Sequence, residues 1–547
     1  MREGSEMNAG DDRRIAVIGL GPRGVGALEA LAAVAETRGL RLSVDVFDPF
    51  PAPGAGPNFD PDESPLCRLN IPMRDIDLRA PDSLNVQPLA DWLDPPIGPD
   101  DFPPRARLGA YIQYRLDALD RAQGVALSRI VEHVDAVHRE GEGWLVQTGD
   151  HAHGPYAEVL LVPGQPKTKP DPQLADWQAH ASRTGCALAQ VYPAKDLLRK
   201  AEDWAGMTVA VRGFALSSVD VLRVLTQGLG GRFTSTGYQP SGNEPRRIVP
   251  FSLDGQPPFP KPETEEIDAR FDPLPDETTM FEQAIATAAC GTPETARQQI
   301  SDSLVPPVHR ILAASGAKTE ADAVAEWLDT EWSHSGSQDS QSALDTLNDG
   351  IAMAAGSKPP SIGYAVGQVW RKWQDQLRQG YNPADTAPDT AALIVGFDEG
   401  LKRYSYGPPV DACRELHALI EAGIVMTRLS CDPDIALIDA GWRLTANGED
   451  VTADVMIDAV LPSPDPAQLV GGPVPGLMEA GWLTAPEDLA ARTVADGRLV
   501  DRDGRPVPGL CLLGRLALGS VIAADSLHDC FGMASHRWAE GVLSRIA

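Results

Sequence analysis

Residues 14–24 read Arg-Ile-Ala-Val-Ile-Gly-Leu-Gly-Pro-Arg-Gly, and this stretch decides the fold. Its apolar residues, 15–18, form the continuous run that is typical of a parallel strand buried on both faces. Apolar side chains then recur at helical spacing, and a second apolar run at 44–47 ends at Asp48. The pattern predicts a strand, a helix and a second strand, which together make a βαβ unit.

The spacing of the glycines gives this unit a chemical role. Gly19 permits a tight turn, Gly21 lets the backbone approach a phosphate, and Gly24 lets the helix pack closely on the strand. Pro22 suits the first turn of the helix because its missing N–H costs no helical hydrogen bond. Asp48 follows Gly24 at about the 20-residue spacing expected for the acid that accepts ribose hydroxyls. We therefore predict a dinucleotide site here; the alternative is a glycine turn in an unrelated α/β domain.

Composition narrows the class of protein and its partners. The 547 residues favour two or three domains. The net charge of −30 repels phosphate backbones and anionic lipids, so we expect neither nucleic acid nor membrane as a partner. Residues 1–13 lack the apolar stretch of a signal peptide and are expected to be a flexible tail of a cytoplasmic protein. His151 and His153 have no partner at metal spacing, so we expect no metal site.

A second, weaker fingerprint follows the apolar strand at 208–211. Gly213 is its first glycine, but Ala215 and Ser218 occupy the second and third glycine positions. The strand near 232–234 ends without an acid, and basic residues lie downstream. Because a 2′-phosphate needs a cation and is repelled by an acid, this pattern favours NADPH over NADH. The alternative is a structural βα turn with solvated basic residues. The basic residues are Arg246, Arg247 and Lys261.

A series of segments, taken in order, resembles the FAD/NAD(P)-binding flavoproteins related to the N-hydroxylating monooxygenases. Some members of that group, the nitro-forming aspartate N-monooxygenases, are similar enough to suggest a substrate. The resemblance covers most of the chain outside the helical region. The segments are residues 15–31, 54–56 with 66–70, 103–111, 162–164, 211–220, 240–246 and 406–409.

The resemblance implies an α/β fold with two Rossmann-like dinucleotide-binding domains and a helical insertion. The FAD-binding domain is then discontinuous, with parts at 14–165 and 455–547. The NAD(P)-binding domain spans 166–454 and carries the insertion at about 270–400. The implied FAD-binding residues are Gly19, Gly21, Pro22, Arg23, Gly24, Asp48, Asn70, Gly164, Gly514 and Asp525. The implied NADPH-binding residues are Gly213, Arg246 and Arg247.

The same resemblance implies an FAD- and NADPH-dependent monooxygenase. Such an enzyme uses molecular oxygen, through a flavin hydroperoxide, to hydroxylate the amino group of a small amino acid such as aspartate. Further oxidation of the same nitrogen gives a nitroso or nitro product. One alternative is an NAD(P)H-dependent flavin dehydrogenase or reductase without oxygen transfer. Another is a flavin-binding regulatory protein. The seven cysteines contain no Cys-x-x-Cys pair, which argues against a disulfide reductase.

The flavin carries the chemistry of such a reaction, so no side-chain nucleophile is required. Asp525 and His528 are the candidate catalytic residues beside the flavin, with a plain helix cap and a structural histidine as alternatives. An amino-acid substrate needs cations for its carboxylates. The candidate substrate-binding residues are Arg74, Arg105 and Arg515.

Overall fold

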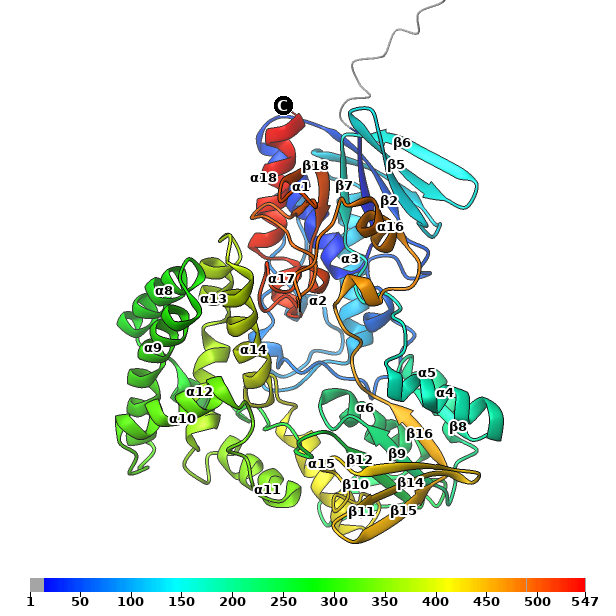
Figure 1. Cartoon of the computed structure of the whole chain (residues 1–547), viewed down its shortest axis with the longest axis vertical. Helices are drawn as coiled ribbons and strands as arrows, with labels where there is room; N and C mark the ends of the chain where they lie inside the picture. The colour runs from blue at the N-terminus through cyan, green and yellow to red at the C-terminus, as the bar shows by residue number, and fades with distance from the viewer. Residues whose placement is uncertain (1–13, 488, 547) are drawn as a thin grey trace, which may run out of the picture.

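The computed structural model describes residues 14–487 and 489–546, so the tail predicted at 1–13 lies outside the described residues. Figure 1 shows three bodies. The first sheet and both ends of the described chain form one at the top, the second sheet lies below it, and a purely helical body lies to the left. Within the described residues, no helix combines the length and apolar character needed to cross a membrane.

The first sheet has six strands in the order β17-β18-β7-β1-β2-β3. All neighbours run parallel except the antiparallel edge pair β17 and β18. β1 is buried almost throughout, as its continuous apolar run predicts, and α1 (Pro22–Thr37) connects it to β2. The predicted βαβ unit is confirmed. The strands are β1 (Arg14–Ile18), β2 (Leu42–Phe47), β3 (Val125–Ile130), β7 (Glu158–Leu161), β17 (Arg498–Val500) and β18 (Pro506–Leu512).

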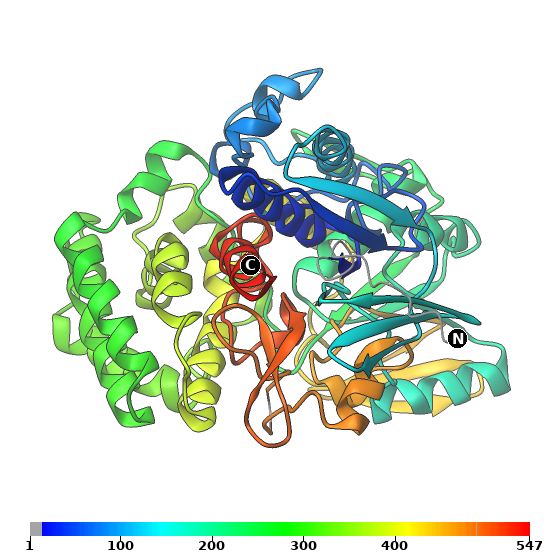
Figure 2. The ribbon, with the colours of Figure 1, turned by 90° about the horizontal axis from the view of Figure 1, so that it is seen from above.

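The C-terminal part of the chain returns to this sheet. β18 pairs in parallel with β7, and α18 (Met533–Ile546) lies along α1, as Figure 2 shows from above. The approach is close, because a Cβ at Gly26 would lie 2.0 Å from the carbonyl oxygen of Cys530. Residues from both ends of the chain therefore share one apolar core.

The second sheet has the order β12-β9-β16-β8, and all its strands are parallel. This sheet corrects two expectations. β16 belongs here, whereas the boundary at 455 had assigned it to the returning part of the first domain. The strand at 232–234, β10, pairs only with β11 in a separate hairpin. An apolar run predicts a buried strand but not its partner. The strands are β8 (Ala187–Gln190), β9 (Thr208–Arg212), β10 (Arg232–Thr234), β11 (Gly237–Gln239), β12 (Arg247–Phe251) and β16 (Val455–Asp458).

Two antiparallel three-stranded sheets accompany the parallel ones. The first contains a hairpin in which Glu140 pairs with Gly143. Its strands are β4 (Ala136–Glu140), β5 (Gly143–Thr148) and β6 (His151–Tyr156). The second consists of β13 (Asp434–Ile438), β14 (Gly441–Ala446) and β15 (Glu449–Ala453).

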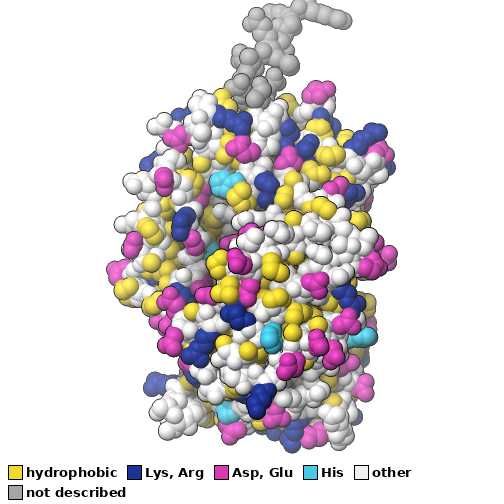
Figure 3. All heavy atoms as spheres, turned by 90° about the vertical axis from the view of Figure 1, so that its left-hand side faces the viewer, with side chains coloured by type: hydrophobic (Ala, Val, Ile, Leu, Met, Phe, Trp, Pro, Cys, Tyr) yellow, Lys and Arg dark blue, Asp and Glu magenta, His cyan; other side chains and the backbone are white. Residues whose placement is uncertain are grey.

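The insertion is helical, as predicted, and its apolar core also takes in Leu489, Ile522 and Ala523 of the returning C-terminal segment. Aromatic rings fill this core, and Phe281 stacks on Trp373 with 4.3 Å between the ring centroids. Acidic and basic side chains are interspersed over the insertion side of the molecule (Figure 3). Its helices are α8 (Pro275–Ala289), α9 (Pro293–Ala314), α10 (Ala321–Ser333), α11 (Ala343–Ala354), α12 (Ile362–Lys372), α13 (Gln374–Tyr381) and α14 (Pro388–Ser405).

The remaining α-helices cover the sheets or connect the three bodies. They are α2 (Leu89–Trp92), α3 (Arg105–Leu119), α4 (Pro172–Thr184), α5 (Ala194–Ala201), α6 (Leu216–Leu225), α7 (Glu265–Asp268), α15 (Val410–Glu421), α16 (Pro473–Ala480) and α17 (Leu527–Cys530). The two segments that connect the sheets run side by side. Lys169 N donates to the carbonyl oxygen of Gln468 at 2.7 Å, and Val470 N donates to that of Lys167 at 2.9 Å.

A buried ion pair fixes α3 to α1. Arg115 is fully buried and donates to both carboxylate oxygens of Glu29, and its guanidinium lies 4.2 Å from the ring centroid of Phe531 near the C-terminus. Replacing Glu29 by alanine leaves the Arg115 charge buried without an acid. We expect E29A to lower the free energy of unfolding by about 3–5 kcal/mol. Urea unfolding of the variant and of the unchanged protein measures this.

The matched control is D120A, which removes the acid of a partly exposed pair with Arg129. Exposed pairs contribute at most about 1 kcal/mol. Equal stability of E29A and D120A would contradict a role for the buried pair.

Candidate functional site

The first glycine turn admits no side chain at two of its three glycines. Gly19 has a φ of +104°, and a Cβ there would lie 2.3 Å from the carbonyl oxygen of Val162. A Cβ on Gly24 would lie 2.5 Å from the carbonyl oxygen of Gly19. At Gly21 no atom lies within 4 Å of the Cβ position. The backbone at Gly21 therefore faces open space at the start of α1, where a phosphate needs access.

The turn lies at a topological switch point. β1 connects to β2 on one side and has β7 on the other, and ligands of such sheets bind outside the carboxyl ends of the strands at this point. Pro22 is the first residue of α1. Asp48 follows β2, and its two carboxylate oxygens accept hydrogen bonds from Leu20 N and Phe50 N. Gly164, with a φ of +65°, follows β7 at the same edge.

The second glycine turn repeats this geometry. Gly213 has a φ of +110°, and its N–H donates to the carbonyl oxygen of Phe251 at 2.8 Å. The N–H of Gly19 donates to that of Phe47 over the same distance. A Cβ on Gly213 would lie 3.2 Å from the backbone of Ala459, which follows the neighbouring strand β16. The two turns therefore occupy equivalent places in the two sheets, although the second lacks two glycines.

This equivalence identifies the counterpart of Asp48. Asp48 follows Phe47 at the end of β2, and Ser252 follows Phe251 at the end of β12. The second turn thus has a hydroxyl where the first has a carboxylate. The hydroxyl of Ser252 donates to the carboxylate of Asp254 at 2.6 Å. We expected the strand at 232–234, β10, to be the one that ends without an acid. The counterpart of β2 is instead β12, and the residue directly after β12 is not an acid.

Arg246 and Arg247 lie at the wrong end of the second sheet for a nucleotide at Gly213. Arg247 is paired with Thr208 at the start of β9, and Arg246 donates to the hydroxyl of Thr208 at 3.2 Å. Gly213 follows the other end of β9, about 16 Å away at 3.3 Å per residue. The structure does not bring these arginines to the turn, because parallel strands place the start of β12 beside the start of β9.

Arg23 links the first turn to the returning C-terminal segment. Its guanidinium lies 2.8 Å from the carboxylate of Asp529 and donates to the carbonyl oxygen of Ala524 at 2.8 Å. Both side chains of the ion pair are buried, at 11% and 5% exposure. Gly514 packs against the same side chain, since its Cβ would lie 2.9 Å from Arg23 Nε. Arg23, Gly514 and the segment around Asp525 are thus brought together, as the predicted FAD-binding set requires.

Asp525 forms ion pairs with Lys402 of α14 at 2.8 Å and with Arg515 at 3.6 Å. Burial raises the pKa of the Asp525 carboxyl, but Lys402 and Arg515 outweigh burial and hold this pKa below its ordinary value. Asp525 is therefore ionised at neutral pH and has no proton to donate. Arg515, predicted to bind substrate, is engaged with this acid.

His528 lies at the start of α17. Its Nε2 is 3.4 Å from the N–H of Asp77, in the geometry of an acceptor. Burial lowers the pKa of His528, and the charge of Arg378 lowers it further, so the imidazole is neutral at pH 7. A neutral ring that accepts a backbone hydrogen bond fits a positioning role for the segment around Asp77.

Arg105 lies in a contact between the first and second sheets rather than near the other predicted substrate residues. Its guanidinium pairs with Asp220 of α6 and donates to the hydroxyl of Tyr192 at 3.2 Å. Tyr192 donates to the same carboxylate at 2.6 Å. The contact is partly to fully buried, and Glu63 adds to it by accepting from two N–H groups at the start of α5. Arg105 therefore holds the two domains together.

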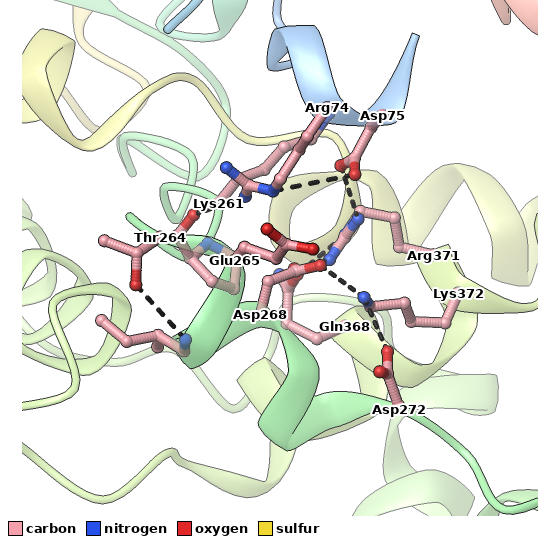
Figure 4. A network of polar contacts seen from close by, with 12 residues as sticks. Arg74, Asp75, Lys261, Thr264, Glu265, Asp268, Asp272, Gln368, Arg371 and Lys372 are labelled. Atoms are coloured by element: carbon pink, nitrogen blue, oxygen red, sulfur yellow. Dashed lines mark hydrogen bonds and ion pairs between the residues drawn. The ribbon is translucent and has the colours of Figure 1, made fainter. Parts of the chain in front are cut away.

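Arg74 has different surroundings, which Figure 4 shows from close by. It lies with Lys261 and Arg371 where the first domain meets the insertion. Lys261 is buried, and its ammonium donates to the carbonyl oxygen of Asn70. Burial lowers the pKa of Lys261 to about 7, and Arg371 contributes to the shift. Lys261, expected downstream of the second turn, thus belongs to a basic cluster beside the first domain.

Acidic side chains balance part of this cluster. Asp268 pairs with Arg371 and Lys372, and Asp75 lies 3.8 Å from Arg74 and 3.6 Å from Arg371. Sequence reasoning found only Arg74 in this role. The other basic members, Lys261, Arg371 and Lys372, lie 187 to 298 residues further along the chain, and no spacing pattern connects them to Arg74.

The fold and the two glycine turns define an α/β protein with two dinucleotide-binding sheets. Residues 16–166 match the model of the FAD-NAD(P)-binding family, and this segment carries the first glycine turn.

Two curated relatives are similar to part of the chain. The nitrosuccinic acid synthase of Aspergillus oryzae is 30% identical over 269 residues, which is 44% of this chain and 41% of the relative. The nitrosuccinate-forming L-aspartate N-monooxygenase of Streptomyces davaonensis is 26% identical over 296 residues, or 44% of each chain. The chain thus matches less than half the length of these relatives.

The fold is that of a solved structure, the reduced form of the ornithine hydroxylase from Pseudomonas aeruginosa. The two share 13% identity with a TM-score of 0.51, and the match covers 98% of this chain and all of that one. This likeness extends over both sheets and confirms the predicted fold class.

Gly21 offers a test of the first turn. Its φ of −85° suits any residue and its Cβ position is open, so alanine fits the protein itself. The added methyl group occupies the space through which a pyrophosphate reaches the backbone. We expect G21A to lose about tenfold or more in FAD affinity, the equivalent of about 1.4 kcal/mol, with an unchanged melting temperature of the cofactor-free protein.

The matched control is G396A in α14, where the Cβ position is also open. FAD titration followed by flavin fluorescence compares the variants. FAD binding by G21A equal to that by G396A would show that the turn does not hold the cofactor.

Proposed function

We propose that the protein is an FAD- and NADPH-dependent monooxygenase that hydroxylates the amino group of a small amino acid such as aspartate. The observation that carries this proposal is the pair of equivalent glycine turns, one ending beside Asp48 and the other beside Ser252. An acid after the first turn suits the ribose hydroxyls of FAD. At the second turn the equivalent position holds the hydroxyl of Ser252, which donates to the carboxylate of Asp254 two residues later.

The residues around each turn fit the cofactor assigned to it. Gly19, Gly21, Gly24 and Asp48 form a cradle for the pyrophosphate and ribose of FAD, with the amino end of α1 favouring the negative charge. At the second turn, exposed Leu253 follows β12, and exposed Val460 and Leu461 follow β16. Exposed apolar side chains at the carboxyl ends of parallel strands are consistent with a nucleotide that covers them.

Reduced FAD, when bound, supplies the activation of molecular oxygen, and the chain supplies position and a protected site. Arg23 and Asp529 hold the C-terminal segment beside the first turn. Asp525, kept ionised by Lys402 and Arg515, has no proton to give, and neutral His528 accepts from a backbone N–H. We assign these residues positioning roles in a discontinuous FAD-binding domain.

The substrate proposal rests on the two curated relatives, whose names specify aspartate or its nitro product. An amino acid and molecular oxygen are then the small-molecule partners, and a cytoplasmic location fits the need for NADPH. Continued oxidation of the same nitrogen to a nitroso or nitro product belongs to the same proposal.

The reaction itself is tested by product mass. We expect the FAD-loaded protein to oxidise NADPH in the presence of aspartate and to add oxygen to its nitrogen, so that labelled dioxygen appears in the product by mass spectrometry. NADPH oxidation that leaves every offered amine unmodified would support a flavin reductase instead. A bound flavin that no nicotinamide nucleotide reduces would support a regulatory protein.

Ser252 offers a test of the nicotinamide site. S252D places a carboxylate at the position equivalent to Asp48, where it repels a 2′-phosphate and accepts from ribose hydroxyls. We expect kcat/KM for NADPH to fall about tenfold or more relative to that for NADH, measured by flavin reduction. Control variant S337D adds the same charge to a loop of the insertion. An unchanged NADPH-to-NADH ratio in S252D would place the nicotinamide nucleotide elsewhere.

A further inference from the structure

The interface between the helical insertion and the first domain holds more buried positive than negative charge. The cationic side chains there are at most 20% exposed. Of the acids paired with them in the described part of the chain, Asp268 alone is comparably buried, at 5%. The others, Asp75, Asp100, Asp272 and Asp375, are 31% to 71% exposed. The buried cations are Arg74, Lys261, Arg371, Lys372 and Arg378. This excess is notable in a chain with a net charge of −30.

Two donors in this cluster are not fully paired. The ammonium of Lys261 donates to one carbonyl oxygen, that of Asn70, and no carboxylate of the described residues lies within the 4.0 Å of an ion pair. The Nε of Arg74 is buried and makes no hydrogen bond, because the carboxylate of Asp75, at 3.8 Å, is within ion-pair distance but too far for one. A buried charge is costly unless it is paired and hydrogen-bonded. Lys261 therefore has no counter-ion among the described residues, and Arg74 has a free Nε–H beside it, so the two together can receive an anion.

The cluster is close to the first glycine turn through a short series of contacts. Arg23, at the turn, pairs with Asp529. The adjacent His528 accepts from the N–H of Asp77, which lies three residues after Arg74. A ligand held by Arg74 and Lys261 is thus beside the segments that enclose the proposed flavin site.

We propose that Lys261 and Arg74 bind a carboxylate of the substrate and so select an amino dicarboxylate. This inference rests on the proposed function and identifies the substrate side of that same site. Lys261 supplies a point charge, and Arg74 supplies its free Nε–H. Arg371 and Lys372 contribute positive electrostatic potential rather than direct hydrogen bonds, because Asp268 already accepts from them. A diamino acid such as ornithine would bring a side-chain ammonium into this cluster in place of a carboxylate, and the cations would repel it.

Lys261 also gives the site a pH dependence. The charged groups facing it are Arg74 and Asp75 of the first domain, Asp268 of α7 and Arg371 of α12. Burial, the largest cause, and the two arginines lower the pKa of Lys261 to about 7, although the two acids act in the opposite direction. A bound carboxylate favours the ammonium, so ligand binding is strongest below pH 7 and weakens as the pH rises through this value.

The test uses succinate, which has two carboxylates and no amine to be oxidised. Calorimetric titration of the FAD-loaded protein at pH 6.5 measures its affinity. We expect K261M to weaken succinate binding by about tenfold or more, as for loss of a charge-assisted hydrogen bond, while K261R retains most of it. The pH dependence between 6 and 8.5 should vanish in K261M. Control variant K358M removes the charge of a half-exposed lysine of the insertion that pairs with Asp349.

Two results would overturn the proposal. One is a succinate affinity of K261M within twofold of that of K358M. If K261M loses FAD or melts early, R74K is the variant to test, because it keeps the charge but removes the Nε–H donor. The second overturning result is unchanged succinate binding in R74K. Neither result depends on turnover. Succinate binding that follows these expectations in a protein that oxidises no amino acid would reject the proposed function and keep the carboxylate site.

Discussion

The contact between the first glycine turn and the returning C-terminal segment is the constraint on which the rest of the structure depends. Arg23 lies at the turn and pairs with Asp529. Gly26 has no side chain, so the backbone of Cys530 packs directly on α1. A side chain at Gly26 would separate these segments. The C-terminal segment also carries Asp525, which pairs with Lys402, and His528, which accepts from the N–H of Asp77. The same close approach therefore places both contacts beside the turn.

The two parallel sheets solve the same geometric problem with different residues. Each turn begins at a glycine with positive φ whose N–H bonds the end of the next parallel strand. The first keeps three glycines, whereas the second keeps only Gly213 and has Ala215 before α6. Both turns require glycine at the first position, where φ is positive and a neighbouring backbone is close. The first turn also requires it at Gly24, whose Cβ would lie 2.5 Å from the carbonyl oxygen of Gly19. The second turn thus shows which part of the fingerprint the fold demands and which part serves ligand approach.

Sequence patterns predicted the local elements well because those elements depend on neighbours in the chain. The apolar run at 15–18, the glycines and the periodicity after residue 24 fix β1, the turn and α1. They did not predict sheet membership, since neither the apolar run of β16 nor the short segment of β10 indicates which strand it pairs with. They also missed the basic cluster, because Arg74, Lys261 and Arg371 come together only through packing of the insertion against the first domain. Arg105 was misassigned for the same reason: its partner, Asp220, lies in another domain.

The paired connections between the sheets have a mechanical consequence. A single connecting segment would let one domain both swing and twist about the other. Here two segments run side by side and are joined by hydrogen bonds between Lys169 and Gln468 and between Val470 and Lys167. A two-stranded ribbon bends across its flat face far more readily than it shears within its plane. Relative movement of the two sheets must therefore bend or break this hydrogen-bonded pair of segments, as well as the contact between Arg105 and Asp220.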